Sequence, residues 1–228
     1  MSYKEICCVT GSRAEYGIFK PLLALLEDSQ HFNLSLVVTG SHFSKNHGSS
    51  INEIRNTFSI AKEINWINER DDSQAAKIHE MSAIQNEFTK YLSETRPDLV
   101  IIVGDRYEML PIATSAYMLS IPLAHIHGGE QTLGSLDEGI RHAITKLSTI
   151  HFTSTNDYAE RVIEMGANSN HVRNVGALGV ERVALHNFKN KDFVEKELGF
   201  KFGKKTAVCT FHPPTSETVS YTHLRAHE

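Results

Sequence analysis

The sequence predicts an α/β fold in which a parallel β-sheet is covered by helices on both faces. Short apolar runs alternate with segments of helical length along most of the chain, which is the pattern of repeated strand–helix units. The apolar runs are nearly continuous, as expected for strands that are buried on both faces. Polar, glycine-containing segments follow several of these runs directly. In such folds ligands bind at the carboxyl ends of the strands, so these segments are where we look for function.

The predicted strands are short runs rich in β-branched and other apolar residues. They cover residues 6–9, 34–38, 99–103, 122–126, 150–153, 172–175 and 206–211. The predicted helices are the longer segments between them, in which apolar residues recur at helical spacing. They cover residues 16–27, 73–94, 107–119, 137–147, 157–165 and 192–198.

The alternation pauses over residues 176–191, a polar stretch, before a new helix and a new strand begin. We therefore expect a domain boundary near residue 185. Residues 1–183 would form an N-terminal domain, and residues 184–218 a linker followed by the beginning of a second α/β domain. The part of that second domain present here is too small to close a core of its own.

The final segment, VSYTHLRAHE at residues 219–228, breaks every pattern in the chain. It resembles the peptide read, codon by codon, from a transposon-type sequencing adapter. We interpret it as an adapter-derived artefact and exclude it from the prediction of the fold. Under this interpretation the natural protein continues beyond Glu217, and His223 and His227 belong to no site. The alternative is a genuine polar tail.

Composition narrows the class of protein. The 228 residues are 40% hydrophobic and 22% charged, and the net charge of −4 gives no basic surface for nucleic acid or an anionic membrane. No signal peptide or bilayer-spanning stretch is evident, so we expect a cytoplasmic protein with a small-molecule partner. Cys7, Cys8 and Cys209 have neither disulfide nor zinc spacing, which favours buried thiols that pack as small hydrophobic groups.

The first polar segment is GSRAEYG at residues 11–17, directly after the first predicted strand. A glycine-opened loop at a helix N-terminus can present backbone N–H groups to an anion, and Arg13 adds a bidentate donor for phosphate. The segment lacks the glycine spacing of a dinucleotide fingerprint and the lysine of a P-loop. A turn glycine beside a solvated arginine is an equally good explanation of the segment taken alone.

The segment GDRYE at residues 104–108 also follows a strand. Asp105 and Glu108 have the spacing of a capping box for the next helix, and spacing alone favours that structural role over catalysis. A carboxylate at this place can nevertheless face the ligand crevice.

The segment HIHGGE at residues 125–130 is the richest in chemistry, because histidines, glycines and several acids lie close together in and after it. Ser135 and Glu138 have capping-box spacing, which leaves Asp137 outside the cap as a further acid. The paired glycines indicate backbone that a ligand or a neighbouring loop approaches closely. The spacing matches no standard zinc site, so no metal is expected.

The last motif is FHPP at residues 211–214, with His212 at the end of the strand predicted to open the second domain. This histidine would overhang a cleft between the domains. A partly buried, hydrogen-bonded histidine is the alternative to a catalytic one.

Taken together, the motifs resemble those of the hydrolysing UDP-N-acetylglucosamine 2-epimerases. The resemblance covers residues 5–217 in family order and is carried by GSRAEYG, VTGSH, GDRYE, HIHGGE, the segment LDEGIRHAITKLSTIHFTST, VGALG and FHP. The block from HIHGGE to IRHAITK is the specific part. GSRAEYG and GDR recur in altered form in the non-hydrolysing epimerases.

The resemblance implies a two-domain GT-B-like fold, with a Rossmann-type N-terminal domain and the active site in the interdomain cleft. It implies elimination of UDP from UDP-N-acetylglucosamine to give 2-acetamidoglucal, followed by addition of water to give N-acetylmannosamine. Such chemistry needs a base, an acid and cations for the pyrophosphate, but neither a metal nor a redox cofactor. We expect the complete protein to be a homo-oligomer.

The family motifs imply roles for particular residues of this chain. The implied catalytic residues are Asp105, Glu130, Asp137 and His212. The implied substrate-binding residues are Arg13, Arg106, His127, Gly128, Gly129, Arg141 and His142. Clustered carboxylates raise one another's pKa, so that one is protonated while another acts as base, and the sequence does not decide which does which.

Three alternatives remain open. The first is a hydrolysing 2-epimerase of the same family that acts on a UDP- or GDP-linked diacetamido sugar and shares every motif. The second is a GT-B glycosyltransferase, against which the crowding of acids around HIHGGE argues. The third is a sensor of sugar nucleotides that binds without turnover.

Overall fold

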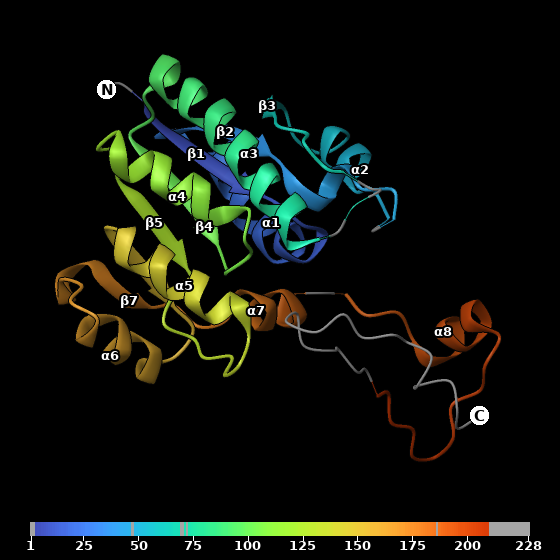
Figure 1. The fold of residues 1–228 in the computed structure, drawn as a ribbon. Coiled ribbons are helices and arrows are strands. Elements are labelled where there is room, and N and C mark those ends of the chain that lie inside the picture. Colours follow the sequence, from blue (N-terminus) through green and yellow to red (C-terminus); the bar gives the residue numbers. More distant parts are fainter. Residues whose placement is uncertain (1–2, 47, 69–70, 72, 186, 210–228) are drawn as a thin grey trace.

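The computed structural model describes residues 3–46, 48–68, 71, 73–185 and 187–209. Within them a single seven-stranded sheet has the order β3-β2-β1-β4-β5-β6-β7, and every neighbouring pair of strands is parallel (Figure 1). The parallel α/β fold predicted from the sequence is confirmed. The strands are β1 (Lys4–Thr10), β2 (Phe32–Val38), β3 (Ile60–Glu63), β4 (Leu99–Val103), β5 (Leu123–Ile126), β6 (Ile150–Thr153) and β7 (Val172–Asn174).

The six predicted helices form, with ends that differ from the prediction by a few residues. The α-helices are α1 (Arg13–Glu27), α2 (Ile51–Arg55), α3 (Gln74–Thr95), α4 (Met109–Met118), α5 (Leu136–Leu147), α6 (Asn156–Glu164), α7 (Leu178–Leu185) and α8 (Lys191–Leu198). Two short 3-10 helices, η1 (Gly40–Phe43) and η2 (Ser169–His171), complete the described part.

Three elements were not predicted: the strand β3 and the helices α2 and α7. β3 has only the four residues IAKE, which end in a lysine and a glutamate, and α2 is a single turn, so neither has a strong apolar signal. α7 lies inside the stretch 176–191, which we expected to be a polar segment without a helix or strand. It forms because Leu178 packs against the hydrophobic cluster beneath α1.

The strand predicted over residues 206–211 is wrong for the part that the structure describes, since residues 206–209 have no strand conformation. A strand needs a neighbour whose N–H and C=O groups pair with its own, and no described strand lies beside this segment. Residues 210 and 211 lie outside the described residues.

The core consists of two clusters on opposite faces of the sheet. Successive residues of β1 point to opposite faces, so Cys7 and Cys8 belong to different clusters. Helices α3, α4 and α5 cover the face of Cys7, and α1 and α2 cover the face of Cys8 (Figure 1). Both thiols are fully buried as expected, and burial raises their pKa. Cys209 is exposed, so the prediction of a buried thiol was wrong there, because the strand expected to bury it does not form.

The strand order reverses between β1 and β4, which are hydrogen-bonded neighbours although α1, β2 and α3 separate them in sequence. At such a switch point the connections leave in opposite directions, and the loops after the two strands border a crevice. The motifs GSRAEYG and GDRYE follow β1 and β4, so the fold brings them to the same crevice. None of the helices in the described part of the chain has the length and hydropathy needed to span a bilayer.

Candidate functional site

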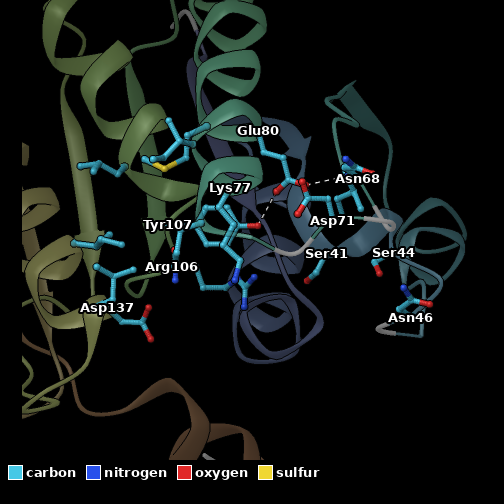
Figure 2. Close-up of a pocket in the computed structure, with 17 residues that line it drawn as sticks. Ser41, Ser44, Asn46, Asn68, Asp71, Lys77, Glu80, Arg106, Tyr107 and Asp137 are labelled. Carbon is cyan, nitrogen blue, oxygen red and sulfur yellow. Dashed lines mark hydrogen bonds between the residues drawn. The ribbon is translucent and has the colours of Figure 1, made fainter. Parts of the chain in front are cut away.

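A cavity of about 650 Å³ opens at the carboxyl end of the sheet, close to this switch point (Figure 2). Its walls come from η1 and the loop after it, the segment after β3, the first turns of α3, the β4–α4 loop and the start of α5. Among its polar lining residues are Ser41, Ser44, Asn46, Asn68, Asp71, Lys77, Glu80, Arg106, Tyr107 and Asp137. The volume suits a ligand of the size of a sugar nucleotide fragment. Of the predicted site residues, Arg106 and Asp137 line this cavity.

Arg106 is held by Glu108, and this pair corrects the predicted capping box. The guanidinium donates to both carboxylate oxygens of Glu108, at 2.7 and 3.2 Å, and the Glu108 side chain is 0% exposed. Helix α4 begins only at Met109, and no side chain caps it. Asp105 therefore does not cap α4. A fully buried carboxylate needs a charged partner, and Arg106 meets that need more strongly than a backbone N–H would.

Glu15 is a buried acid at the switch point that the sequence reasoning overlooked. Its side chain accepts a hydrogen bond from the Gly11 N–H at 2.9 Å, while its other oxygen, Oε1, has no hydrogen-bond partner among the described residues. Burial raises the pKa of Glu15 to about 7, against the opposing charge of Arg106. The spacing of Ser12 and Glu15 is that of a capping box, so the sequence signalled a cap here but not the burial.

Asp105 pairs with Arg141 from helix α5. Nη2 of the guanidinium is bonded to the Asp105 carboxylate, and Nη1 donates to the backbone carbonyl of Glu130 at 2.9 Å. Arg141 is only 5% exposed, so it orients the acids and offers little surface to a ligand. Burial raises the pKa of Asp105 and outweighs the lowering effect of Arg141; the nearby carboxylates of Asp137 and Glu130 raise it further.

Glu130 has the opposite electrostatic environment. His127 Nδ1 lies 2.8 Å from its Oε1, and the Ser154 hydroxyl donates to the same oxygen at 2.6 Å. Burial alone would raise the pKa of Glu130, but these hydrogen bonds and the nearby charges of His127 and Arg141 outweigh it and leave the pKa below its ordinary value. Glu130 is therefore ionised at neutral pH, and its second oxygen, Oε2, accepts no hydrogen bond from the described residues.

Asp137 and His142 lie on the first two turns of α5. Ser135 is the N-cap, as predicted, but its hydroxyl bonds the backbone and the carboxylate of Asp137, at 3.2 Å each, rather than forming a reciprocal box with Glu138. Glu138 lies 3.7 Å from His142 Nε2. The sequence therefore predicted the cap correctly and its partner wrongly, because residues two and three positions after an N-cap compete for the same hydroxyl.

Close contacts with neighbouring segments of the chain explain why residues 128 and 129 are both glycine. A Cβ on Gly129 would lie 2.6 Å from the Tyr158 carbonyl oxygen of α6, and its φ of +80° disfavours other residues. A Cβ on Gly128 would lie 2.9 Å from His125 Nδ1. Of the two explanations that the sequence left open for these glycines, close approach of a neighbouring segment is sufficient.

His125 is a second residue whose role the sequence reasoning missed. Its ring is fully buried and bridges the Gly104 carbonyl, at 2.7 Å, and the Thr145 hydroxyl, at 3.1 Å. Burial lowers the pKa of His125 to about 4, so the ring is neutral and Nε2 carries the proton that the carbonyl accepts. His125 thereby fixes the turn that presents Asp105. The sequence did contain a signal for this burial, because His125 lies within a predicted apolar strand.

The remaining predicted residues lie farther from this cluster or outside it. Arg13 is exposed at the first position of α1 and forms no ion pair within the described residues. His212 lies outside the residues that the structure describes.

A doubly wound parallel sheet with acids grouped at its carboxyl edge places this chain among the α/β proteins whose ligand sites lie at a strand-order reversal. Within this class, the chain belongs to the UDP-N-acetylglucosamine 2-epimerase family, which it matches over residues 24–226.

Curated relatives include "Polysialic acid biosynthesis protein P7" of Escherichia coli, which is 43% identical over 95% of this chain and 55% of the relative. "GDP/UDP-N,N'-diacetylbacillosamine 2-epimerase (hydrolyzing)" of Campylobacter jejuni is 36% identical over 94% of this chain and 56% of the relative. "UDP-N-acetylglucosamine 2-epimerase" of Neisseria meningitidis is 32% identical over 94% of this chain and 55% of the relative. The chain thus spans little more than half the length of these relatives.

Solved structures share the fold. The UDP-GlcNAc 2-epimerase of Methanocaldococcus jannaschii, in complex with UDP-GlcNAc and UDP, superposes with a TM-score of 0.69 at 21% identity over 84% of this chain and 51% of that chain. The enzyme of Neisseria meningitidis bound to UDP-GlcNAc superposes with a TM-score of 0.67 at 21% identity over 79% of this chain and 49% of that chain. These likenesses show that this chain shares the fold of about half of each of those GT-B-like proteins.

Proposed function

We propose that this chain forms the N-terminal domain of a hydrolysing nucleotide-sugar 2-epimerase that converts UDP-N-acetylglucosamine and water into N-acetylmannosamine and UDP. The observation that supports it best is the grouping of Asp105, Glu130 and Asp137, of which Asp137 lines the cavity. These carboxylates are close enough for Asp137 and Glu130 to raise the pKa of Asp105. Three acids in differing electrostatic environments are what an elimination followed by a hydration requires.

In the proposed reaction Glu130 is the base. A base must be ionised when substrate binds, and the hydrogen bonds on Oε1 keep Glu130 ionised while Oε2 stays open. Oε2 removes the proton from C2 of the sugar, the electron pair of that bond forms the C1–C2 double bond, and the C1–O bond breaks with its electrons leaving on UDP. The product of this half of the reaction is 2-acetamidoglucal.

In the second half, water adds its oxygen to C1 and a proton returns to C2 on the opposite face. Burial favours the protonated form of Asp105, which makes it the proposed acid. Asp137 lines the cavity and is the second candidate for this role. No electrons are gained or lost overall, so the reaction needs no redox cofactor.

The second domain completes the proposed site. His212 would face the carboxylates from across the interdomain cleft, and Arg13 would bind the pyrophosphate at the N-terminus of α1. The boundary near residue 185, the homo-oligomer and the cytoplasmic location belong to the same proposal. The length of the relatives supports a second domain, because about 45% of their length has no counterpart here.

A diacetamido sugar nucleotide is the second candidate substrate. The Campylobacter relative with that substrate in its name is 36% identical, and the corresponding Legionella pneumophila protein is 37% identical, against 32% for the Neisseria UDP-N-acetylglucosamine 2-epimerase. These sugars carry an acetamido group where UDP-N-acetylglucosamine carries the hydroxyl at C4. The substrates therefore differ in a polar group that a binding site can distinguish.

The test is product analysis with the complete protein, including its second domain, and no added acceptor. UDP-N-acetylglucosamine and UDP- and GDP-linked diacetamido sugars are each incubated with enzyme, and released nucleotide and free sugar are measured. Release of UDP together with free N-acetylmannosamine supports the proposal. Turnover of the diacetamido sugar alone would assign the second candidate. Binding without turnover, or turnover only after an acceptor is added, would instead identify a sensor or a glycosyltransferase.

A further inference from the structure

Two buried carboxylates share one guanidinium at the reversal of the strand order. Arg106 donates to both oxygens of Glu108 from Nε and Nη2, at 3.2 and 2.7 Å. The side chain of Glu15 lies close by, because a Cβ on Gly11 would be 3.3 Å from Glu15 Oε2 and 3.8 Å from the Cβ of Glu108. The positive charge of Arg106 acts on both acids. One cation therefore faces two carboxylates.

The other titratable groups beside Arg106 are neutral. Burial and the charge of Arg106 lower the pKa of His42 to about 4, so its ring is uncharged at neutral pH. Burial and nearby carboxylates raise the pKa of Tyr107, whose hydroxyl donates to Glu80 at 2.8 Å. The charged groups that act on Glu15 are Arg106, which favours its ionisation, and Glu108, which opposes it. This cluster of three is neutral when Glu15 is protonated and carries one net negative charge when Glu15 is ionised.

The two oxygens of Glu15 have different surroundings. Oε2 accepts the hydrogen bond from the Gly11 N–H at 2.9 Å, whereas Oε1 is buried and has no hydrogen-bond partner among the described residues. A buried ionised oxygen without a partner is costly, so the proton of neutral Glu15 belongs on Oε1. Because the pKa of Glu15 is about 7, a modest change in the charge nearby alters its protonation at neutral pH.

Arg106 has one nitrogen to offer a ligand. Its Nη1 donates to none of the described residues, and the side chain is 38% exposed. Arg106 also lines the cavity (Figure 2). A guanidinium suits the oxygen atoms of phosphate-type anions, which are recognised by its directed N–H groups. An anion bound there would bring negative charge to a cluster that already contains two acids.

We propose that Glu15 takes up a proton when a phosphate-type anion binds to Arg106 in the cavity. With Glu15 ionised, the anion meets one net negative charge, whereas with Oε1 protonated it meets a neutral cluster. Binding of the anion and protonation of Glu15 therefore favour each other, and by linkage the two effects are equal. Glu15 thus sets the affinity of this site without contacting the ligand. The inference rests on the proposed function only for the natural anion, which would be the pyrophosphate of a sugar nucleotide.

Sulfate is the probe for the 228-residue chain, because its own charge does not change near neutral pH. ¹³C NMR follows the carboxyl carbons of Glu15 and Glu164 as the pH is raised, in sodium sulfate and in sodium chloride of equal ionic strength. The pKa of Glu15 should be higher in sulfate by about one pH unit. Glu164, an exposed acid on α6, is the internal control and should titrate identically in both salts. An equal pKa of Glu15 in the two salts would overturn the proposal.

The complete protein supplies a second test, in a Glu130→Gln background that suppresses turnover of UDP-N-acetylglucosamine. The pyrophosphate of this ligand is a diester and does not titrate near neutral pH. Calorimetry in buffers of different ionisation enthalpy counts the protons taken up on binding. At pH 7.5 the background should take up about half a proton more than the same protein with Glu15→Gln. Its affinity should also fall about fivefold more between pH 6 and pH 8.

Glu164→Gln in the same background is the matched control and should change neither quantity. Equal proton uptake with and without Glu15→Gln would show that another group binds the proton, and the proposal would fall. If the wild type releases UDP from no nucleotide sugar, the proposed function fails. The sulfate titration of the chain still decides, in that case, whether Glu15 is coupled to an anion at Arg106.

Discussion

Arg141 of helix α5 joins the Asp105 carboxylate to the backbone carbonyl of Glu130 through two nitrogens of one guanidinium. Asp105 follows β4, whereas Glu130 and Arg141 belong to the unit of β5 and α5, and the arginine side chain is almost fully buried. A planar guanidinium with fixed donor directions sets the spacing of its partners, which a flexible lysine would not do. Arg141, which the motifs implied as a substrate-binding residue, is thus placed to orient the two acids.

The three carboxylates give the first prediction. In the complete protein, Asp105→Asn, Glu130→Gln and Asp137→Asn should each lower kcat by about 100-fold or more, which is the usual cost of removing an acid or a base. Circular dichroism should show that the fold is kept. Glu164→Gln, which changes an exposed acid on α6, is the matched control. A variant that retains near-normal release of product would show that its residue has a structural role only.

Solvent chemistry gives the second prediction. Product formed in deuterated water should carry deuterium at C2, because a carboxylic acid exchanges its proton with water before it returns one to the glycal. Mass spectrometry or NMR of the free sugar measures the label. An unlabelled C2 would indicate internal return of the same proton or a route without elimination.

The burial of Glu15 gives a prediction about stability. Its folded-state pKa of about 7 lies above the ordinary value of 4.5, so the folded protein binds this proton more tightly than the unfolded chain does. The stability that this proton contributes is fully present below about pH 4.5 and is lost as the pH rises through 7. Glu15→Gln should therefore gain stability relative to the wild type between pH 5 and pH 8, by at most about 3 kcal/mol.

Urea unfolding of the 228-residue chain at several pH values measures this difference. Glu164→Gln serves again as the exposed control and should show no such pH dependence. A constant difference between Glu15→Gln and the wild type from pH 5 to pH 8 would mean that Glu15 is ionised in the folded protein throughout.

The glycines of the HIHGGE region allow a matched comparison. Gly129 and Gly134 both have φ of +80°, but a Cβ on Gly134 would meet no atom within 4 Å, whereas one on Gly129 would meet the Tyr158 carbonyl. Gly134→Ala should cost about 1 kcal/mol for the backbone conformation alone. Gly129→Ala should cost a further amount of about 1 to 3 kcal/mol because of overpacking. Equal losses in the free energy of unfolding, measured with urea, would show that α6 shifts to accommodate the methyl group without further cost.

The last prediction concerns the 228-residue chain by itself, which we expect to release no UDP from UDP-N-acetylglucosamine. The chain spans about 55% of its relatives, and the proposed site needs a second domain to position His212 and to bind UDP. Catalysis depends on placement within a fraction of an ångström, so the carboxylates of the N-terminal domain are insufficient without it. Enzyme-dependent UDP and N-acetylmannosamine over several hours would refute both the need for the second domain and the two-domain site.

Much of the fold could be predicted from sequence because its signals are local. A buried strand needs a short apolar run and a helix needs apolar residues at helical spacing, and both are visible without knowledge of the partners. The strand β3 was not predicted because it lies at the edge of the sheet, where Lys62 and Glu63 form ion pairs with Glu87 and Arg55 and burial imposes no apolar pattern. For residues 206–209 the error was the reverse, because a strand was predicted and none forms. The segment has the composition of a strand but no neighbour to pair with.

The sequence by itself determined which segments carry the chemistry, because in a parallel α/β fold the loop after each strand reaches the same edge of the sheet. Only the tertiary structure decided how these residues are paired. Arg141 meets Asp105 across 36 positions, and Leu178 meets His127 across 51. Spacing can suggest a local cap, as it wrongly did for Asp105 and Glu108. In the folded protein a buried charged group instead pairs with the oppositely charged side chain that packing brings close to it. That choice depends on burial and geometry, which are properties of the folded chain alone.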